Sequence, residues 1–173
     1  APGKLRNLEE LLRGSPLQGH SGIGHTRWAT HGVPNETNAH PHISGDVVIV
    51  HNAIIENFYE IKVELEAKGV KFETQTDTEV VAHLLAEHRN AGVAPVEAVK
   101  KVLGRLRGAF ALAIMFKSEN DLMVGARNGP PLAVGHGEGQ MFLGSDAIAL
   151  SPFTNKITYL EDGDWVVLTR NSM

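Results

Sequence analysis

Apolar residues recur three and four positions apart over much of the first two thirds of the chain, the spacing that places them on one face of a helix. Leucines within residues 5–12 predict a first helix that ends near Gly14. Three later helices are predicted with their starts at Asn57, Thr76 and Pro95. Asn57 and Thr76 are each followed three residues later by glutamate, which is typical of a capping box. Proline is favoured in the first turn of a helix, which supports a helix start at Pro95.

Short apolar runs predict strands, of which two fall early and the rest in succession after Gly108. The early pair, 21–28 and 46–52, is separated by a long polar stretch, and long loops are disproportionately functional. The late runs are apolar on both faces, which favours a sheet covered by helices on one side and by a second sheet on the other. Asp162-Gly163 is a hairpin signal between the last two runs. The late runs are 108–116, 121–127, 131–137, 140–145, 156–161 and 164–169.

Composition limits the class of protein. With 173 residues and 42% hydrophobic content, the chain can bury one core, so we expect a single domain over residues 1–173. The formal net charge is −4 and no segment concentrates Lys or Arg, so we expect no nucleic-acid partner. No apolar run approaches the roughly 20 residues that span a bilayer, and the first residues are not a secretory signal, so no membrane association is expected.

The chain contains no cysteine. This excludes disulfides, metal-thiolate sites and a cysteine nucleophile within these residues. A cytoplasmic location is compatible with that composition.

Candidate chemistry is concentrated between His25 and Asp77. The motif GHTRWATHG places Arg27, Thr30 and His31 together at the predicted end of a strand. A guanidinium fork suits a carboxylate or phosphate, and the neighbouring hydroxyl and imidazole groups can complete an anion pocket. The alternative is a surface salt bridge, the common role of an arginine.

The histidines of NAHPH, His40 and His42, are spaced by two and have other histidines nearby, which raises the possibility of zinc. No carboxylate stands at ligand spacing beside them. We therefore expect no metal and favour histidines that fasten a loop by hydrogen bonds.

Asp77 in TQTDTEV can satisfy free amides at a helix start, or bind an ammonium group while the helix dipole keeps its carboxylate ionised. Arg27 for a carboxylate and Asp77 for an ammonium would together recognise the α-groups of an amino acid. In VVIVHNAIIEN, four β-branched residues deliver Asn52 to the rim of a buried strand, whereas Asn57 is expected to cap the next helix.

These motifs, with RGAFALAIM, GPPLAVG, FLGSDAIAL and YLEDGDWVVL, resemble the glutaminase domain of the glucosamine-6-phosphate synthase family, over nearly the whole chain. That domain is a class II glutamine amidotransferase of the N-terminal-nucleophile hydrolase superfamily. The resemblance implies an α+β fold, a four-layer αββα sandwich that hydrolyses glutamine to glutamate and ammonia without a cofactor. The ammonia would pass to a sugar-isomerase module, absent from this chain, which aminates fructose 6-phosphate.

The resemblance also implies roles for particular residues. Arg27, Thr30 and His31 would hold the α-carboxylate of glutamine, and Asp77 its α-ammonium. The side chain of Asn52 and the backbone N–H of Ala53 would form the oxyanion hole, and Trp28 would belong to a lid over the substrate.

Two departures from the family pattern stand out. The family nucleophile is an N-terminal cysteine, so we expect this chain to lack the first strand and helix of the sandwich and to be inactive as given. Ala53 stands where the family has glycine; a positive φ there would strain alanine by roughly 1 kcal/mol or more. The alternative function is a non-catalytic module that binds glutamine or glutamate or has a regulatory role.

Overall fold

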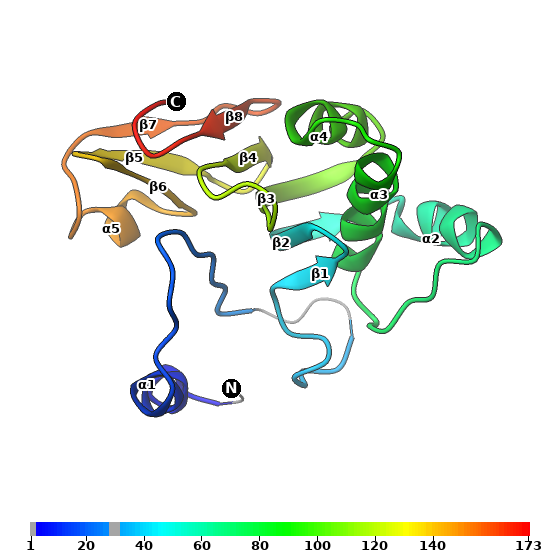
Figure 1. Cartoon of the computed structure of the whole chain (residues 1–173), viewed down its shortest axis with the longest axis horizontal. Coiled ribbons are helices and arrows are strands. Elements are labelled where there is room, and N and C mark those ends of the chain that lie inside the picture. Colours follow the sequence, from blue (N-terminus) through cyan, green and yellow to red (C-terminus); the bar gives the residue numbers. More distant parts are fainter. Residues whose placement is uncertain (1–2, 28–31) are drawn as a thin grey trace.

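The computed structural model describes residues 3–27 and 32–173, which form two antiparallel sheets and a group of helices (Figure 1). The larger sheet has the strand order β1-β2-β3-β4-β8, and the smaller has the order β6-β5-β7. The strands are β1 (His42–Ser44), β2 (Val47–Ile55), β3 (Gly108–Phe116), β4 (Met123–Asn128), β5 (Ala133–Gly137), β6 (Gln140–Gly144), β7 (Ile157–Tyr159) and β8 (Trp165–Leu168).

Three helices cover one face of the larger sheet, on the right of Figure 1. They are α2 (Phe58–Ala67), α3 (Thr78–Asn90) and α4 (Pro95–Leu103), and all three were predicted from the sequence. The short helix α5 (Ala147–Leu150) lies against β5 and β6. None of the helices in the described ranges is long and apolar enough to cross a membrane.

Strand β2 divides the two halves of the core because its side chains alternate between the faces of the sheet. Val47 and Ile49 join the cluster formed with α3, α4 and β3. Val50 and Asn52 point the other way and line a cavity that is also bounded by residues of β6. A second buried cluster, which includes Val134 and Val166, joins the two sheets. The helix layer and the two packed antiparallel sheets are those of the expected sandwich.

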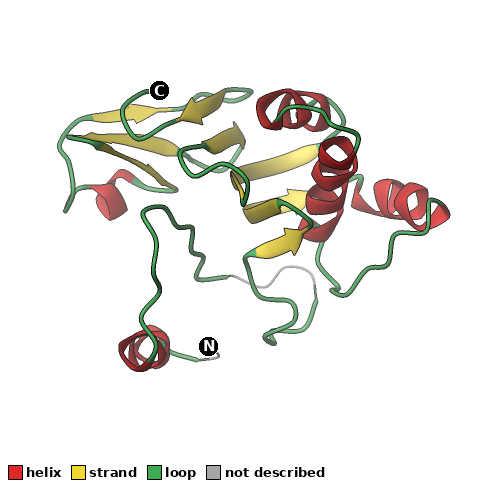
Figure 2. Cartoon of the chain, viewed as in Figure 1, coloured by secondary structure: helices red, strands yellow, loops and turns green. Residues whose placement is uncertain are grey.

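Helix α1 (Leu5–Gly14) forms as predicted but stands apart from the sheets, joined to them by a long stretch without regular structure (Figure 2). None of its residues is buried. Its leucines, including Leu5 and Leu11, are exposed to solvent.

Two strand predictions were wrong. Residues 21–27, the described part of the expected strand 21–28, form no strand, because a strand exists only with a ladder partner and none pairs with this segment among the described residues. Asp162-Gly163 forms a turn but not a hairpin, because β7 and β8 belong to different sheets. The amide of Gly163 instead donates to the carbonyl of Arg127 on β4.

Both capping predictions were also wrong. Asn57 precedes α2, but its side chain makes no capping hydrogen bond. Its amide donates to the Arg105 carbonyl at 2.9 Å, and its oxygen accepts from the Arg107 amide at 2.9 Å. Asp77, not Thr76, is the residue before α3, and its side chain makes no capping bond either. Both side chains serve long-range contacts that sequence spacing does not reveal.

The role of Asn57 can be tested because a cap and a bridge respond differently to aspartate. Asp caps a helix about as well as Asn, so a capping residue would tolerate the change. In Asn57→Asp the donor to Arg105 is lost and a charge faces a carbonyl oxygen, so we expect urea unfolding to show a loss of about 1–2 kcal/mol. Asn57→Ala should lose a similar amount. A neutral or stabilising Asn57→Asp would show that capping dominates.

Candidate functional site

The predicted site residues that the structure describes line one cavity of about 240 Å³ between the end of β2 and the start of α3. This volume suits a small molecule of amino-acid size. Trp28, Thr30 and His31, which the sequence also singled out, lie outside the described residues. The lining is His25, Arg27, His40, His51, Asn52, Ala53, Thr76, Asp77, Thr78 and Pro130.

Asn52 and Ala53 lie in β2, opposite Ala111 and Phe110 of β3. Ladder hydrogen bonds on this strand fix where the Asn52 carboxamide and the Ala53 amide are presented. Asn52 also borders a second, larger cavity of about 400 Å³ that reaches β6 and α5. The Asn52 side chain therefore lies between the 240 Å³ cavity and the 400 Å³ cavity.

Ala53 has φ +83°, a conformation that L-residues other than glycine rarely adopt. Arg27 is the other non-glycine residue with positive φ among those described, at +48°. Strain of this kind persists only where surrounding structure imposes it, and it concentrates at functional sites. The two strained residues both line the 240 Å³ cavity.

Asp77 is 3% exposed, and its carboxylate reaches back to β2. Oδ2 accepts a hydrogen bond from the Ile55 amide at 2.8 Å and lies 3.8 Å from Nδ1 of His51. A buried carboxylate requires compensation by donors or by a positive charge. A ligand ammonium in the cavity would supply that charge.

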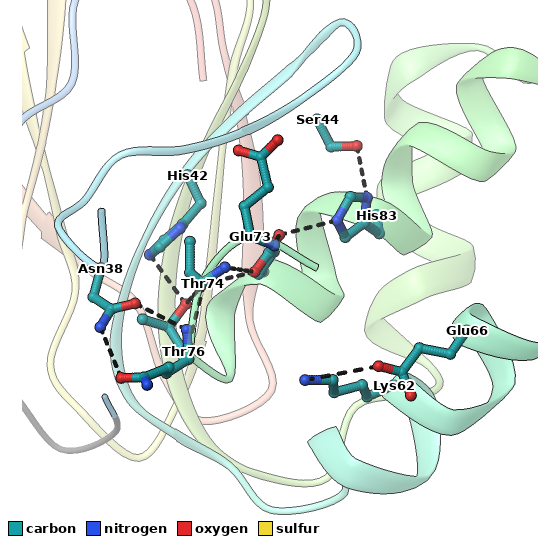
Figure 3. Close-up of polar contacts among 11 residues, drawn as sticks. Asn38, His42, Ser44, Lys62, Glu66, Glu73, Thr74, Thr76 and His83 are labelled. Atoms are coloured by element: carbon teal, nitrogen blue, oxygen red, sulfur yellow. Dashed lines mark hydrogen bonds and ion pairs between the residues drawn. The ribbon is translucent and has the colours of Figure 1, made fainter. Parts of the chain in front are cut away.

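The turn that carries Asp77 is fastened by a polar network, shown in Figure 3. Asn38 Oδ1 accepts from the Gln75 amide at 2.8 Å, and its Nδ2 donates to Gln75 Oε1 at 3.2 Å. Glu79 accepts from the amides of Glu73 and Thr74, both at 2.8 Å. Burial opposes ionisation of Glu79, but these bonds, with those from His83 and the Thr74 hydroxyl, outweigh it and lower its pKa to about 2.

Arg27 anchors its own loop. Its guanidinium donates to the carbonyls of Gly32 and Val33, each at 3.2 Å. A guanidinium has five N–H donors and can bind more than one acceptor at once. A Cβ on Gly32, which has φ +76°, would come within 2.9 Å of Asn38 Nδ2. This close approach requires glycine at the turn that Arg27 binds.

Histidines pack around the cavity. The rings of His25 and His40 stack with centroids 4.3 Å apart, and His42 meets His40 edge-on at 4.7 Å. The hydroxyl of Thr78 lies 3.2 Å from Nε2 of His40 and 3.0 Å from Nδ1 of His51. Among the described residues, no group of three or more His, Asp or Glu side chains has an arrangement that could hold a metal ion. The contacts are those of a hydrogen-bonded and stacked cluster.

Burial keeps two of these imidazoles neutral. It lowers the pKa of His40 to about 2, with the neighbouring His25 as the next cause. It lowers the pKa of His51 to about 4, although the carboxylate of Asp77 acts in the opposite direction. His25, His51 and Thr78 were not assigned site roles from the sequence. The only available signal was the number of histidines between residues 25 and 51.

The geometry and the motifs agree with a comparison against known families. Residues 25–152 match the glutamine amidotransferase domain model. The chain belongs to this family of glutamine amidotransferase domains.

Within that family, the chain is 69% identical over 173 residues to a glutamine–fructose-6-phosphate aminotransferase (isomerizing) from Mesorhizobium japonicum. It is 64% identical to the protein of that name from Brucella suis, and 62% identical to the one from Zymomonas mobilis. In each case all of this chain is covered, but only 28% of the relative. The chain thus spans less than a third of the length of these relatives.

Solved structures support the fold. One is titled as the allosteric regulatory enzyme of purine biosynthesis, with 28% identity and a TM-score of 0.69; the match covers 84% of this chain and 32% of that one. Another is glutamine phosphoribosylpyrophosphate amidotransferase from B. subtilis, with 28% identity, the same coverage and a TM-score of 0.66. The N-terminal-nucleophile type of sandwich expected from the sequence is confirmed.

The strain at Ala53 predicts that Ala53→Gly stabilises the fold. Removing Cβ at φ +83° relieves roughly 1 kcal/mol or more, partly offset by the entropy of glycine in the unfolded chain. We expect a net gain of about 0.5–1 kcal/mol in urea unfolding. Ala113→Gly, at a β3 position without a positive φ, is a matched control that should lose about 0.5–1 kcal/mol. Equal losses in both variants would contradict the strain.

The neutral histidines predict acid sensitivity. His51 takes up a proton near its ordinary pKa of 6.5 only when unfolded, so stability falls as pH drops from 6.5 toward about 4. Between about pH 7 and about pH 5, His51 alone should account for a loss of about 2 kcal/mol in the free energy of unfolding.

His51→Gln should reduce this pH dependence, whereas His20→Gln, at an exposed position, should keep it. An NMR titration of the parent chain provides a second measurement. A His51 imidazole that titrates near pH 6.5 would contradict the assignment.

Proposed function

We propose that this domain hydrolyses glutamine to glutamate and ammonia, as the glutaminase part of an enzyme that converts fructose 6-phosphate to glucosamine 6-phosphate. The observation that carries the proposal is the presence of Arg27, Asn52, Ala53 and Asp77 on one cavity. A cation and an anion can bind the α-groups of this substrate, and a carboxamide beside a backbone amide can stabilise the oxyanion that forms when its side-chain amide is attacked.

Substrate recognition uses the two charges. The Arg27 guanidinium binds the α-carboxylate, together with Thr30 and His31, and Asp77 binds the α-ammonium. The buried state of Asp77 supports this role, because a ligand ammonium would compensate a carboxylate that is 3% exposed. Trp28 is proposed as part of a lid over the bound substrate.

The chemical step needs a nucleophile that attacks the side-chain amide carbon of glutamine. In the resembled family this is a cysteine thiol, and this chain contains no cysteine. As the thiolate adds to the amide carbon, the carbonyl oxygen becomes negative. The amide nitrogen then takes up the proton that the thiol gave up and leaves as ammonia, and water hydrolyses the remaining thioester to release glutamate and restore the thiol. The Asn52 side chain and the Ala53 amide donate hydrogen bonds to that oxygen, where the charge develops.

The remainder of the reaction is assigned to a sugar-isomerase module elsewhere in the enzyme, which receives the ammonia. We propose that this domain works without a cofactor or metal, binds neither nucleic acid nor a membrane, and belongs to a cytoplasmic enzyme. Names of relatives that share 60–69% identity with this chain support the sugar substrate.

The test uses a chimeric enzyme in which this chain replaces the 173-residue segment that it matches in the Mesorhizobium japonicum relative. Glutamate release should occur and depend on site residues. Asn52→Ala should lower kcat by about 10²–10³-fold. Asp77→Asn keeps the acceptor for Ile55 but loses the charge, and should raise the KM for glutamine by about 10–100-fold. Asp121→Asn, at an exposed position, is the control. A chimeric enzyme that releases no glutamate would refute the proposal.

The second candidate is an amino-acid-binding module without catalysis, favoured by Ala53, a residue with a Cβ at a positive φ in the proposed oxyanion hole. Calorimetry of the 173-residue chain with glutamine and with glutamate separates the two. Binding without hydrolysis in the chimeric enzyme would support the module, whereas hydrolysis supports the glutaminase.

A further inference from the structure

His25 lies against the residue proposed as the oxyanion donor. Its Nε2 is 2.7 Å from Oδ1 of Asn52. Its other ring nitrogen, Nδ1, is 2.8 Å from the backbone nitrogen of Arg27. The imidazole therefore bridges the loop of Arg27 and the strand of Asn52.

The donor and acceptor in one contact determine the donor and acceptor in the other, because both contacts involve the same imidazole ring. A backbone amide can only donate, so the Arg27 N–H donates and Nδ1 of His25 accepts. A neutral imidazole that accepts at Nδ1 carries its proton on Nε2. Nε2–H must then donate, so the atom it meets on Asn52 must be the carboxamide oxygen.

This chain of donors fixes the orientation of Asn52. The amide nitrogen and oxygen are alike in size, so hydrogen-bond partners decide which way a carboxamide is turned. With Oδ1 held by His25, Nδ2 is on the opposite side and makes no hydrogen bond to another residue in the described part of the chain. Its two protons remain available to an oxyanion.

We propose that His25 is a positioning residue for the glutaminase reaction: through the tautomer that the Arg27 amide imposes, it holds Asn52 with its donor group toward the reacting carbonyl. The inference rests on the proposed function and adds a residue to it. His25 itself need not touch glutamine. Its effect is carried by the orientation of Asn52.

Two further features restrain the imidazole. Its ring stacks on His40, with an interplanar angle of 29°. The positive φ of Arg27, +48°, belongs to the residue whose amide turns back onto Nδ1. A strained backbone at this point is explained if it holds that amide in place.

Variants of His25 separate positioning from packing. His25→Phe keeps a ring for the stack on His40 but removes both nitrogens. His25→Gln supplies a carboxamide that can accept from one side and donate to Asn52 from the other. His136→Phe is the control, because His136 in β5 is also partly buried and its ring also makes a hydrogen bond, to Thr158 at 2.8 Å.

In the chimeric enzyme, His25→Phe should lower kcat by about 10²-fold, close to the loss of one oxyanion donor, with less than about a threefold change in KM. His25→Gln should recover most of that loss. The double variant His25→Phe with Asn52→Ala should be no slower than Asn52→Ala alone, because the two residues act as one unit. His136→Phe should retain the parent rate.

An additive double variant, a change in KM alone, or a His25→Gln as slow as His25→Phe would overturn the proposal. NMR of the 173-residue chain tests the premise without catalysis. Long-range proton–nitrogen spectra should show His25 as the Nε2–H tautomer, and the Nδ1–H tautomer would overturn the proposal. A parent chimeric enzyme without glutaminase activity would instead refute the proposed function, and the positioning role of His25 in that reaction with it.

Discussion

A buried hydrogen bond from backbone to side chain helps to connect the two elements that make the site: the backbone N–H of Ile55, at the end of β2, donates to the carboxylate of Asp77, before α3. Asn52 and Ala53 precede this bond on the strand, and the cavity lies between it and the Arg27 loop. This hydrogen bond is buried, and an unpaired amide or carboxylate in its place would destabilise the fold. It therefore holds the strand end, the helix start and the substrate-sized space in one arrangement.

Much of this arrangement could be predicted from the sequence. The apolar periodicity gave α1 to α4, and the β-branched run before His51 gave β2 with Asn52 near its end. Arg27, Asn52, Ala53 and Asp77 were named as candidates and line one cavity. Local patterns suffice for the helices and for β2 because a helix or strand face is decided by near neighbours. Ala53 and the oxyanion role of Asn52 were named only from the family resemblance.

The rest depends on partners distant in sequence. Asn57 binds two residues 48 and 50 positions away, so its capping motif was misleading. Residues 21–27 have strand-like composition, but pairing, not composition, makes a strand. No role was assigned to His25 from the sequence, because its tautomer depends on the Arg27 backbone and on its partner Asn52 in β2. Hydrogen-bond direction is a property of the folded geometry and leaves no mark in residue spacing.

The pairing of β2 with β3 affects how fast the site forms during folding. Asn52 lies opposite Ala111, a separation of 111 − 52 = 59 residues, and α2, α3 and α4 all fall within that interval. Closing a loop of this length lowers chain entropy before the strand contacts compensate for it, which slows the formation of non-local sheets. The helices can form from local contacts alone, whereas the rim of β2 acquires a fixed position only when β3 has joined it. The cavity-lining residues of β2 thus become rigid only when a strand much further along the chain has joined them, although their own segment is continuous in sequence.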